Sequence, residues 1–293
     1  MHDVSVYLLA LKYKNTSSVF APLSSAHYSV IKGEALSMLA YGEAGMRHTG
    51  DIDLLISRAN LSLFEKILKQ NGFTTREQPR SDRVMMMAYS HQVFPWFKNI
   101  SPWGNVTIDL NFDIFWGEYT GKRVDIDEFL SDTAEIEIYG VKVKTLLPLK
   151  AMVQLILHHY KDMNSIFLLA TRKSIKYEMF KDLYYLLKNN IEAIPLDRLY
   201  TMSKEYEIIP YVYHVLYHTG LLFDDVILKE YIAAFKTLEG ESLINSYGLN
   251  DSERREWRYD FNARLETDSI YELIKDDLTD NDVEKIRINR KVF

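Results

Sequence analysis

Residues 51–56 read Asp51-Ile52-Asp53-Leu54-Leu55-Ile56, and this stretch decides the fold that the sequence predicts. Side chains alternate in an extended strand, so the two aspartates would share one face while the alternate apolar residues point into the core. Like charges side by side repel, and a hard divalent cation such as Mg²⁺ is their usual partner, together with phosphate oxygens of a substrate. The stretch therefore predicts a strand with a metal site, in an enzyme acting on a nucleoside triphosphate.

The residues before this strand predict a turn that can approach phosphate. Residues 27–32 are expected to form a strand that ends at Gly33, and residues 35–41 a short helix. Glycine lets a backbone come close to a phosphate group, and the N-terminus of the following helix favours negative charge. Gly33 is therefore a candidate nucleotide-binding residue.

A third aspartate lies on a later strand. Residues 106–112 alternate strictly, with apolar side chains at the even-numbered positions and polar ones at the odd-numbered positions. Asp109 falls in the middle of the polar face. Asp113 shares that face and competes with it, but Asp113 is expected to begin the next loop.

The pattern of elements predicts an α+β fold, a mixed sheet with flanking helices followed by a C-terminal helical domain. Other expected strands are residues 83–89 and 93–97, paired as a hairpin, and residues 135–139 and 141–144. After Pro148 the apolar spacing becomes helical. We expect a catalytic domain over residues 1–147, a helical domain over 148–250 and a charged tail over 251–293, solvated or partly disordered.

Composition limits the class of protein. The 293 residues carry a formal net charge of -6, which gives no general affinity for nucleic acid and disfavours a long DNA or RNA partner. The absence of cysteine excludes disulfides and thiolate chemistry. The N-terminus lacks a secretory pattern, and the apolar stretch 206–223 is interrupted by polar residues and Pro210. We therefore expect a cytoplasmic protein without a membrane span.

The ordered set of Gly33, Asp51-x-Asp53 and Asp109 resembles the polymerase-β-like nucleotidyltransferase superfamily. More narrowly, several segments resemble an uncharacterised bacterial nucleotidyltransferase group, over about residues 27 to 190. These segments are Val30-Ile31-Lys32-Gly33, Gly45-Met46-Arg47, Asp51-Ile52-Asp53-Leu54-Leu55-Ile56, Gly72-Phe73, Ile108-Asp109-Leu110-Asn111, His158-His159 and Asp182-Leu183.

The resemblance implies transfer of a nucleoside monophosphate from a nucleoside triphosphate to a hydroxyl, with release of pyrophosphate. Asp51 and Asp53 would hold Mg²⁺, as one or two ions that Mn²⁺ can replace, and Asp109 would be the third carboxylate, nearest the attacking hydroxyl. Lys32 and Arg47 would neutralise phosphate charge beside Gly33. The acceptor is a small molecule, a protein or an RNA end, and the acidic balance favours the first two.

Simpler structural explanations exist for these residues. Asp-x-Asp pairs are common at strand ends, Lys32 could lie on the plain surface, and Arg47 could anchor its own loop to a carboxylate. Two residues also depart from the family pattern: Glu34 follows the turn glycine and would repel phosphate, and Asn111 stands where the narrower group often has histidine.

The departures keep a second function open. A catalytically weak relative could bind nucleotide or a partner protein as a regulatory module of the same fold. A third hypothesis, a nuclease of the HEPN type built on the helical half, ranks last because that half lacks the required Arg-x4-6-His motif.

Overall fold

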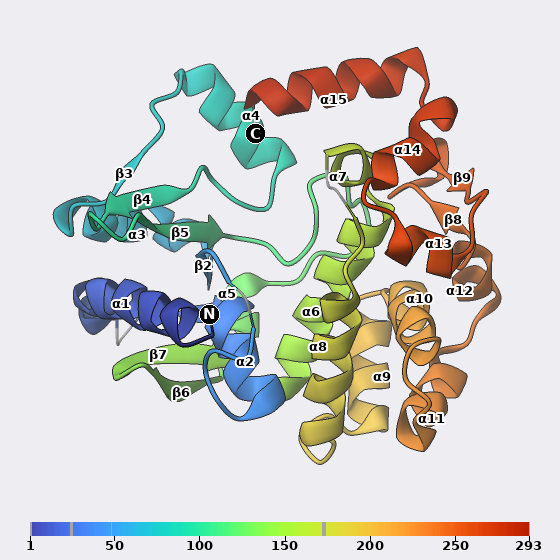
Figure 1. The fold of residues 1–293 in the computed structure, drawn as a ribbon, viewed down its shortest axis with the longest axis horizontal. Helices are drawn as coiled ribbons and strands as arrows, with labels where there is room; N and C mark the ends of the chain where they lie inside the picture. The colour runs from blue at the N-terminus through green and yellow to red at the C-terminus, as the bar shows by residue number, and fades with distance from the viewer. Residues whose placement is uncertain (1, 24–25, 48, 172–173, 293) are drawn as a thin grey trace. The chain divides into compact units, whose positions relative to one another are not determined.

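The computed structural model describes residues 2–23, 26–47, 49–171 and 174–292 (Figure 1). Its contacts divide the chain into two compact units. The sheet unit comprises Met1–Ile114 and Val124–Ala151, and the helical unit comprises Phe115–Arg123 and Met152–Phe293. Compact units need not fold separately, so the expected domain division at residue 147 stays a prediction.

In the described part of the chain, the sheet unit is built on seven strands in the order β3-β4-β5-β2-β1-β7-β6. The sheet is mixed, because β2 runs antiparallel to β1 but parallel to β5. The strands are β1 (Tyr28–Ile31), β2 (Ile52–Ile56), β3 (Thr74–Thr75), β4 (Trp96–Asn99), β5 (Asn105–Asn111), β6 (Thr133–Ile138) and β7 (Val141–Leu146). The α+β class expected from the sequence is confirmed.

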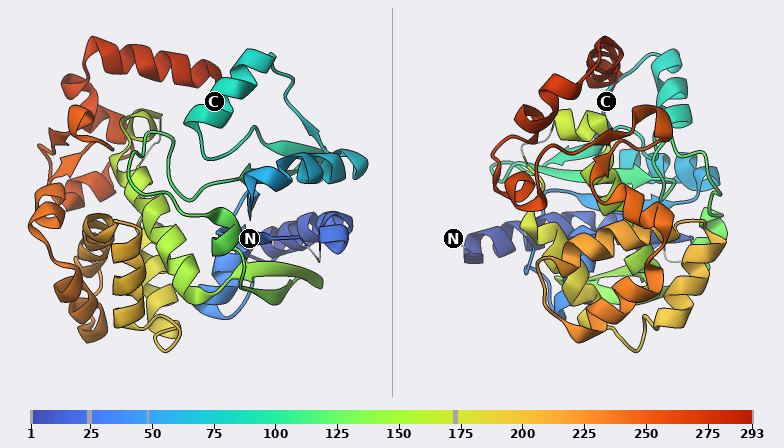
Figure 2. Two further views of the ribbon diagram at one scale, coloured as in Figure 1. Left: turned by 180° about the vertical axis from the view of Figure 1, so that it is seen from behind. Right: turned by 90° about the vertical axis from the view of Figure 1, so that its right-hand side faces the viewer.

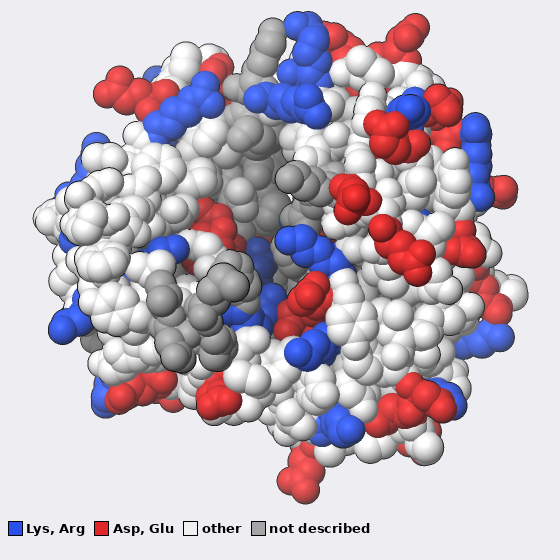
Figure 3. All heavy atoms as spheres, viewed as in Figure 1, with Lys and Arg blue, Asp and Glu red and all other residues white. Residues whose placement is uncertain are grey.

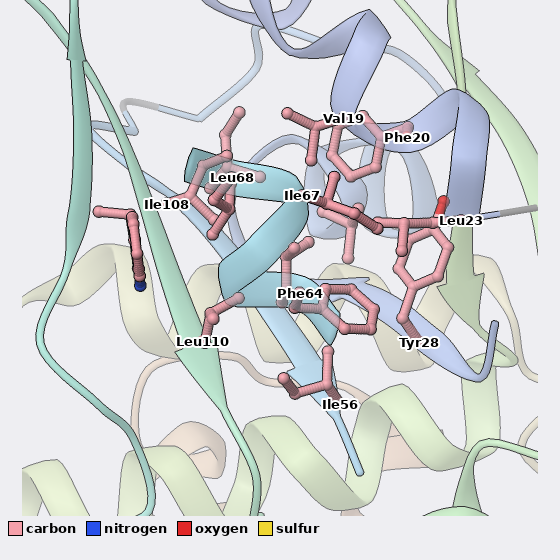
Figure 4. Packing of buried hydrophobic residues seen from close by; sticks show 14 of the residues in the cluster. Val19, Phe20, Leu23, Tyr28, Ile56, Phe64, Ile67, Leu68, Ile108 and Leu110 are labelled. Atoms are coloured by element: carbon pink, nitrogen blue, oxygen red, sulfur yellow. The ribbon is translucent and has the colours of Figure 1, made fainter. Parts of the chain in front are cut away.

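Helices α1 and α3 cover one face of this sheet. Their apolar side chains meet those of β1, β2 and β5 in a single buried cluster, part of which is drawn in Figure 4. Phe64 and Leu68 of α3 are fully buried, and burying such a side chain contributes roughly 1.5–3 kcal/mol. The helices of the sheet unit are α1 (His2–Phe20), α2 (Gly33–Tyr41), α3 (Leu61–Gln70), α4 (Arg80–Tyr89) and α5 (Ile126–Phe129).

The expected strand over residues 83–89 is wrong, because these residues belong to helix α4. Methionine favours helices, and Asp82 in the first turn complements the helix dipole. Met86 is buried whereas its neighbour Met85 is 46% exposed, as on an amphipathic helix. Arg83 also donates to both carboxylate oxygens of Glu65 on α3, each at 2.9 Å. The strand β4 instead pairs with β3 and β5.

The helical unit is a bundle centred on α10, which packs against α8, α9, α11 and α12; the yellow and orange helices of Figure 2 form this bundle. Its helices are α7 (Ile166–Thr171), α8 (Tyr177–Asn189), α9 (Leu196–Glu205), α10 (Ile209–Gly220), α11 (Val226–Phe235), α12 (Leu238–Leu243), α13 (Phe261–Glu266), α14 (Ile270–Ile274) and α15 (Asp280–Val292), and α6 (Pro148–Asn164) leads into it. A short hairpin pairs β8 (Ser246–Tyr247) with β9 (Arg255–Glu256). None of the helices in the described ranges combines the length and apolar character of a membrane span.

The charged segment 251–293 contains helices α13 to α15. Phe261, Ile270 and Ile274 are buried in one apolar cluster with Phe180 of α8. Although charged residues dominate the sequence of this segment, its few apolar side chains are spaced so that each short helix buries one face.

Candidate active site

Asp53 and Asp109 lie side by side in the centre of the sheet. Strands β2 and β5 are parallel, and their register places Asp53 directly opposite Asp109. The apolar neighbours of each aspartate point to the opposite face, into the core under α1 and α3. Asp51 is exposed and precedes β2 by one residue. The structure therefore pairs two of the three carboxylates that the sequence predicted, and places Asp51 just before the same strand as Asp53.

Two neighbours hold the Asp53 carboxylate in place. The Lys32 ammonium lies 2.9 Å from Asp53 Oδ1 in an ion pair with little exposure to solvent. Asn111 Nδ2 donates to the same oxygen at 3.3 Å and to the carbonyl oxygen of Leu54 at 3.4 Å. Asn111 was identified from the sequence only as a departure from the family pattern, yet it is a direct partner of Asp53.

Asp109 has the most perturbed carboxyl group of the site. Its Oδ1 is buried and has no hydrogen-bond partner among the described residues. The pKa of Asp109 is raised to about 7, first by burial and then by the Asp53 and Asp51 carboxylates, while Lys32 opposes the shift. The pKa of Asp51 is also raised, by lost hydration and then by Asp53, although the side chain reaches solvent. The Lys32 ammonium opposes the rise in the pKa of both Asp51 and Asp109, and Lys12 also opposes it at Asp51.

These residues fit a hard divalent cation in ligand type and in charge. Carboxylate and amide oxygens are the ligands that Mg²⁺ prefers, and the Oδ1 atoms of both Asp109 and Asn111 are buried without a partner among the described residues. Within the same residues, however, no three His, Asp or Glu side chains already form a cluster that could hold a metal ion. Side chains would therefore have to move for three carboxylates to coordinate one cation.

The turn before α2 has an unusual backbone. Lys32 has φ 57° and ψ −153°, a region that residues other than glycine rarely adopt, and Gly33 has φ 44°. A Cβ atom on Gly33 would come no closer than 3.6 Å to its neighbours, so the conformation and not the space requires glycine there. The turn directs the Lys32 side chain toward Asp53 and starts α2 at Gly33.

Arg47 lies at the same turn. Its Nη1 donates to the carbonyl oxygen of Gly33 at 3.2 Å, so the guanidinium, Lys32 and Gly33 are neighbours. All three nucleotide-binding candidates from the sequence are therefore close together. Asp113 is the other candidate for the third carboxylate, and it lies outside β5, which ends at Asn111.

Comparisons with known proteins identify the family of the chain. The family model described as uncharacterised nucleotidyltransferase matches residues 24–224 of the chain. The chain belongs to this family. A solved structure, an antigenic nucleotidyltransferase-like protein from Paracoccidioides brasiliensis, is similar at 16% identity and a TM-score of 0.37, over 60% of this chain and 75% of that one. The search of curated proteins gives no match.

One residue of this nucleotidyltransferase-family chain has a role that the sequence did not indicate. Glu34 is buried, and its Oε2 accepts hydrogen bonds from the Gly45 amide at 2.6 Å and from the Tyr139 hydroxyl at 3.2 Å. Its Oε1 accepts from Thr49 Oγ1 at 3.3 Å. Both carboxylate oxygens are thus engaged in holding the loop 43–49, which carries Arg47.

Proposed function

We propose that this chain is a Mg²⁺-dependent nucleotidyltransferase of the polymerase-β-like type, which transfers a nucleoside monophosphate from a nucleoside triphosphate to a hydroxyl group. The observation that carries the proposal is the pairing of Asp109 with Asp53 across β2 and β5, with the pKa of Asp109 raised to about 7. Membership of the nucleotidyltransferase family supports the same reaction class.

The residues have distinct roles in this proposal. Asp51, Asp53 and Asp109 would hold one or two Mg²⁺ ions, which supply positive charge to the triphosphate and to the attacking oxygen. Lys32 and Arg47 attract the triphosphate to the turn at Gly33. The acceptor oxygen forms a bond to the α-phosphorus while the bond to the β-phosphate oxygen breaks. Pyrophosphate leaves, and the Asp109 carboxylate, nearest the attacking hydroxyl, would help to remove the hydroxyl proton.

The charge distribution favours a small molecule or a protein as the acceptor. On the face drawn in Figure 3, Lys and Arg side chains are interspersed with Asp and Glu side chains. A long nucleic acid would require an extended basic surface to release its counterions. The same proposal includes the cytoplasm as the compartment, where nucleoside triphosphates are supplied.

Nucleotide binding and pyrophosphate release test this function separately. With Mg²⁺ and each of the four nucleoside triphosphates in turn, we expect at least one to raise the melting temperature of the wild type. Asp53→Asn and Asp109→Asn should each lose this shift. Asp82→Asn, an isosteric change on α4 at a residue that is not among the candidate site residues, is the matched control and should keep it. Labelled nucleotide should then mark an acceptor in a cell lysate.

If none of the four nucleotides raises the melting temperature of the wild type, the proposal is contradicted. Binding without pyrophosphate release, with every candidate acceptor tested, would instead support the regulatory module. One observation favours that alternative: Lys32 already neutralises Asp53 at 2.9 Å, so this carboxylate has a partner without any metal ion.

A further inference from the structure

The side chain of Asn111 is buried on the same face of the sheet as Asp53 and Asp109. Asn111 follows Asp109 by two residues on β5, so the two side chains share a face, and its exposed fraction is only 1%. The backbone of Asn111 is paired with Leu55 of β2 on one side and, through an isolated bridge, with Gln92 on the other. Neighbours on both sides therefore hold this residue in place beside the two carboxylates.

The contacts of the Asn111 amide fix its orientation. Its Nδ2 donates to Asp53 Oδ1 at 3.3 Å and to the carbonyl oxygen of Leu54 at 3.4 Å. An ionised carboxylate and a carbonyl oxygen only accept hydrogen bonds, so the reversed amide would place oxygen against oxygen at both contacts. The nitrogen therefore faces these two acceptors, and Asn111 Oδ1 points away from them.

The Oδ1 atom of Asn111 lacks the partner that a buried oxygen needs. It is buried, and no described residue donates a hydrogen bond to it. Asp109 Oδ1, on the same strand face, is buried without a donor in the same way. Leaving buried acceptors unpaired costs free energy, and native structures usually satisfy them. A cation bound on this face would satisfy the amide oxygen and the carboxylate oxygen together.

The Lys32 ammonium does not take the place of such a cation. It lies 2.9 Å from Asp53 Oδ1, the same oxygen that accepts from Asn111 Nδ2. Neither donor is directed at Asp53 Oδ2, and Lys32 gives no hydrogen bond to the unpaired oxygen of Asn111. The two donors thus fix one oxygen of Asp53 and leave the other for a further partner.

We propose that Asn111 has two roles at the cation site: its Nδ2 positions Asp53, and its Oδ1 is itself a ligand of the Mg²⁺ ion. Amide oxygens, like carboxylates, are suitable ligands for hard divalent cations. An amide also adds a ligand without adding a fourth negative charge to a site that already has three aspartates. The inference rests on the cation site of the proposed function and deepens it.

Titration of the full chain with Mn²⁺, without nucleotide, tests both roles, with free Mn²⁺ measured by electron paramagnetic resonance. Asn111→Leu should weaken binding about tenfold or more, since loss of a ligand or of its hydrogen-bond partner has effects of this size. Asn111→Asp keeps an oxygen ligand but cannot donate to Asp53 when ionised, and it should bind about as tightly as the wild type. The titrations are run in about 1 M KCl, which screens exposed charges beyond about 3 Å, so that retained binding reflects direct coordination.

A matched control separates the site from the strand. Asn105→Leu makes the same change at an exposed asparagine of β5 and should bind Mn²⁺ like the wild type. Urea unfolding in the presence of a chelator shows whether each variant is folded without metal. If Asn111→Leu does not fold, Asn111→Ala, which removes the amide without adding bulk, replaces it.

Three outcomes would overturn the ligand role of Asn111. The wild type binds no Mn²⁺ at millimolar concentration, the variant without the amide binds like the wild type, or Asn111→Asp loses as much affinity as Asn111→Leu, as expected for a purely structural amide. If Asp53→Asn loses Mn²⁺ binding while Asn111→Leu keeps it, this inference alone fails. If the wild type binds Mn²⁺ through Asn111 but no nucleotide raises its melting temperature, the transferase function fails and the metal ligand stands.

Discussion

At the scale of the residue, Lys32 combines an ion pair to Asp53 with a strained backbone conformation. Its ammonium neutralises Asp53, and its φ of 57° with ψ of −153° lies in a region that glycine adopts far more readily. Such conformations persist where the surrounding structure enforces them, and they are concentrated at functional sites. In this backbone conformation the Lys32 ammonium reaches the Asp53 carboxylate.

Two substitutions of Lys32 separate strain from charge. Lys32→Ala and Lys32→Gly both remove the ammonium, so both should abolish the thermal shift caused by Mg²⁺ and nucleotide. Lys32→Gly should nevertheless be more stable than Lys32→Ala by about 1 kcal/mol, because relief of roughly 1–3 kcal/mol of strain exceeds the entropy cost of glycine. Urea unfolding measures the difference. Equal stability of the two variants would mean that the backbone of Lys32 is not strained.

At the scale of the element, the loop 43–49 depends on α2 through Glu34. This carboxylate reaches the Gly45 amide, Thr49 and Tyr139, and the loop that it holds carries Arg47 to the Gly33 carbonyl. Gly45 has φ 87° and little room for a side chain, since a Cβ atom there would lie 3.0 Å from Val6. Helix, loop and turn therefore form one connected support for the site.

Removal of the Glu34 carboxylate should loosen this loop. We expect Glu34→Ala to destabilise the protein by about 2–3 kcal/mol, because buried donors lose a charged acceptor. Nucleotide affinity should fall as well, since Arg47 is no longer held. Glu43→Ala, in the same loop but exposed, is the control and should change stability by less than about 0.5 kcal/mol. Similar losses in both variants would exclude the role of Glu34.

Elements of the site differ in how far the sequence predicts them. The aspartates of β2 and β5 could be predicted, because a period of two residues fixes which side chains share a face. The run Met85-Met86-Met87 was misassigned, since three adjacent apolar residues fit a strand and a helix equally well. The role of Glu34 could not be predicted, because its partner Tyr139 is 105 residues away and only the folded sheet brings them together. The same holds for Asn111 and Asp53, which are 58 residues apart.

At the scale of the whole molecule, the helical unit contains buried histidines that couple stability to pH. His214 and His218 of α10 are almost fully buried, and His218 Nδ1 donates to the His214 carbonyl oxygen at 2.8 Å. Burial lowers the pKa of His218 to about 3, with Arg264 adding to the effect. The pKa of His214 is also lowered, by burial and then by His218 and Arg264.

Acid should therefore destabilise the folded chain in a defined pH range. An unfolded histidine binds a proton below about pH 6.5 while the folded one does not, so stability falls as the pH decreases from there toward 3. As the pH is lowered from 7 to 5, each of these two buried histidines should decrease the free energy of unfolding by about 2 kcal/mol. His218→Gln should reduce this loss, measured by urea unfolding at several pH values. His27→Gln, at an exposed histidine, should leave the pH dependence unchanged. An identical acid response of His218→Gln and the wild type would contradict this assignment.

The strand order also determines how the sheet ends. One edge is β3, which spans only Thr74–Thr75, and the other is β6, where Glu135 and Glu137 are exposed. A very short edge strand offers few free amide and carbonyl groups, and charged side chains oppose the approach of another strand. Both edges therefore disfavour pairing with a strand of another molecule during folding, so the sheet should not extend from one chain to the next.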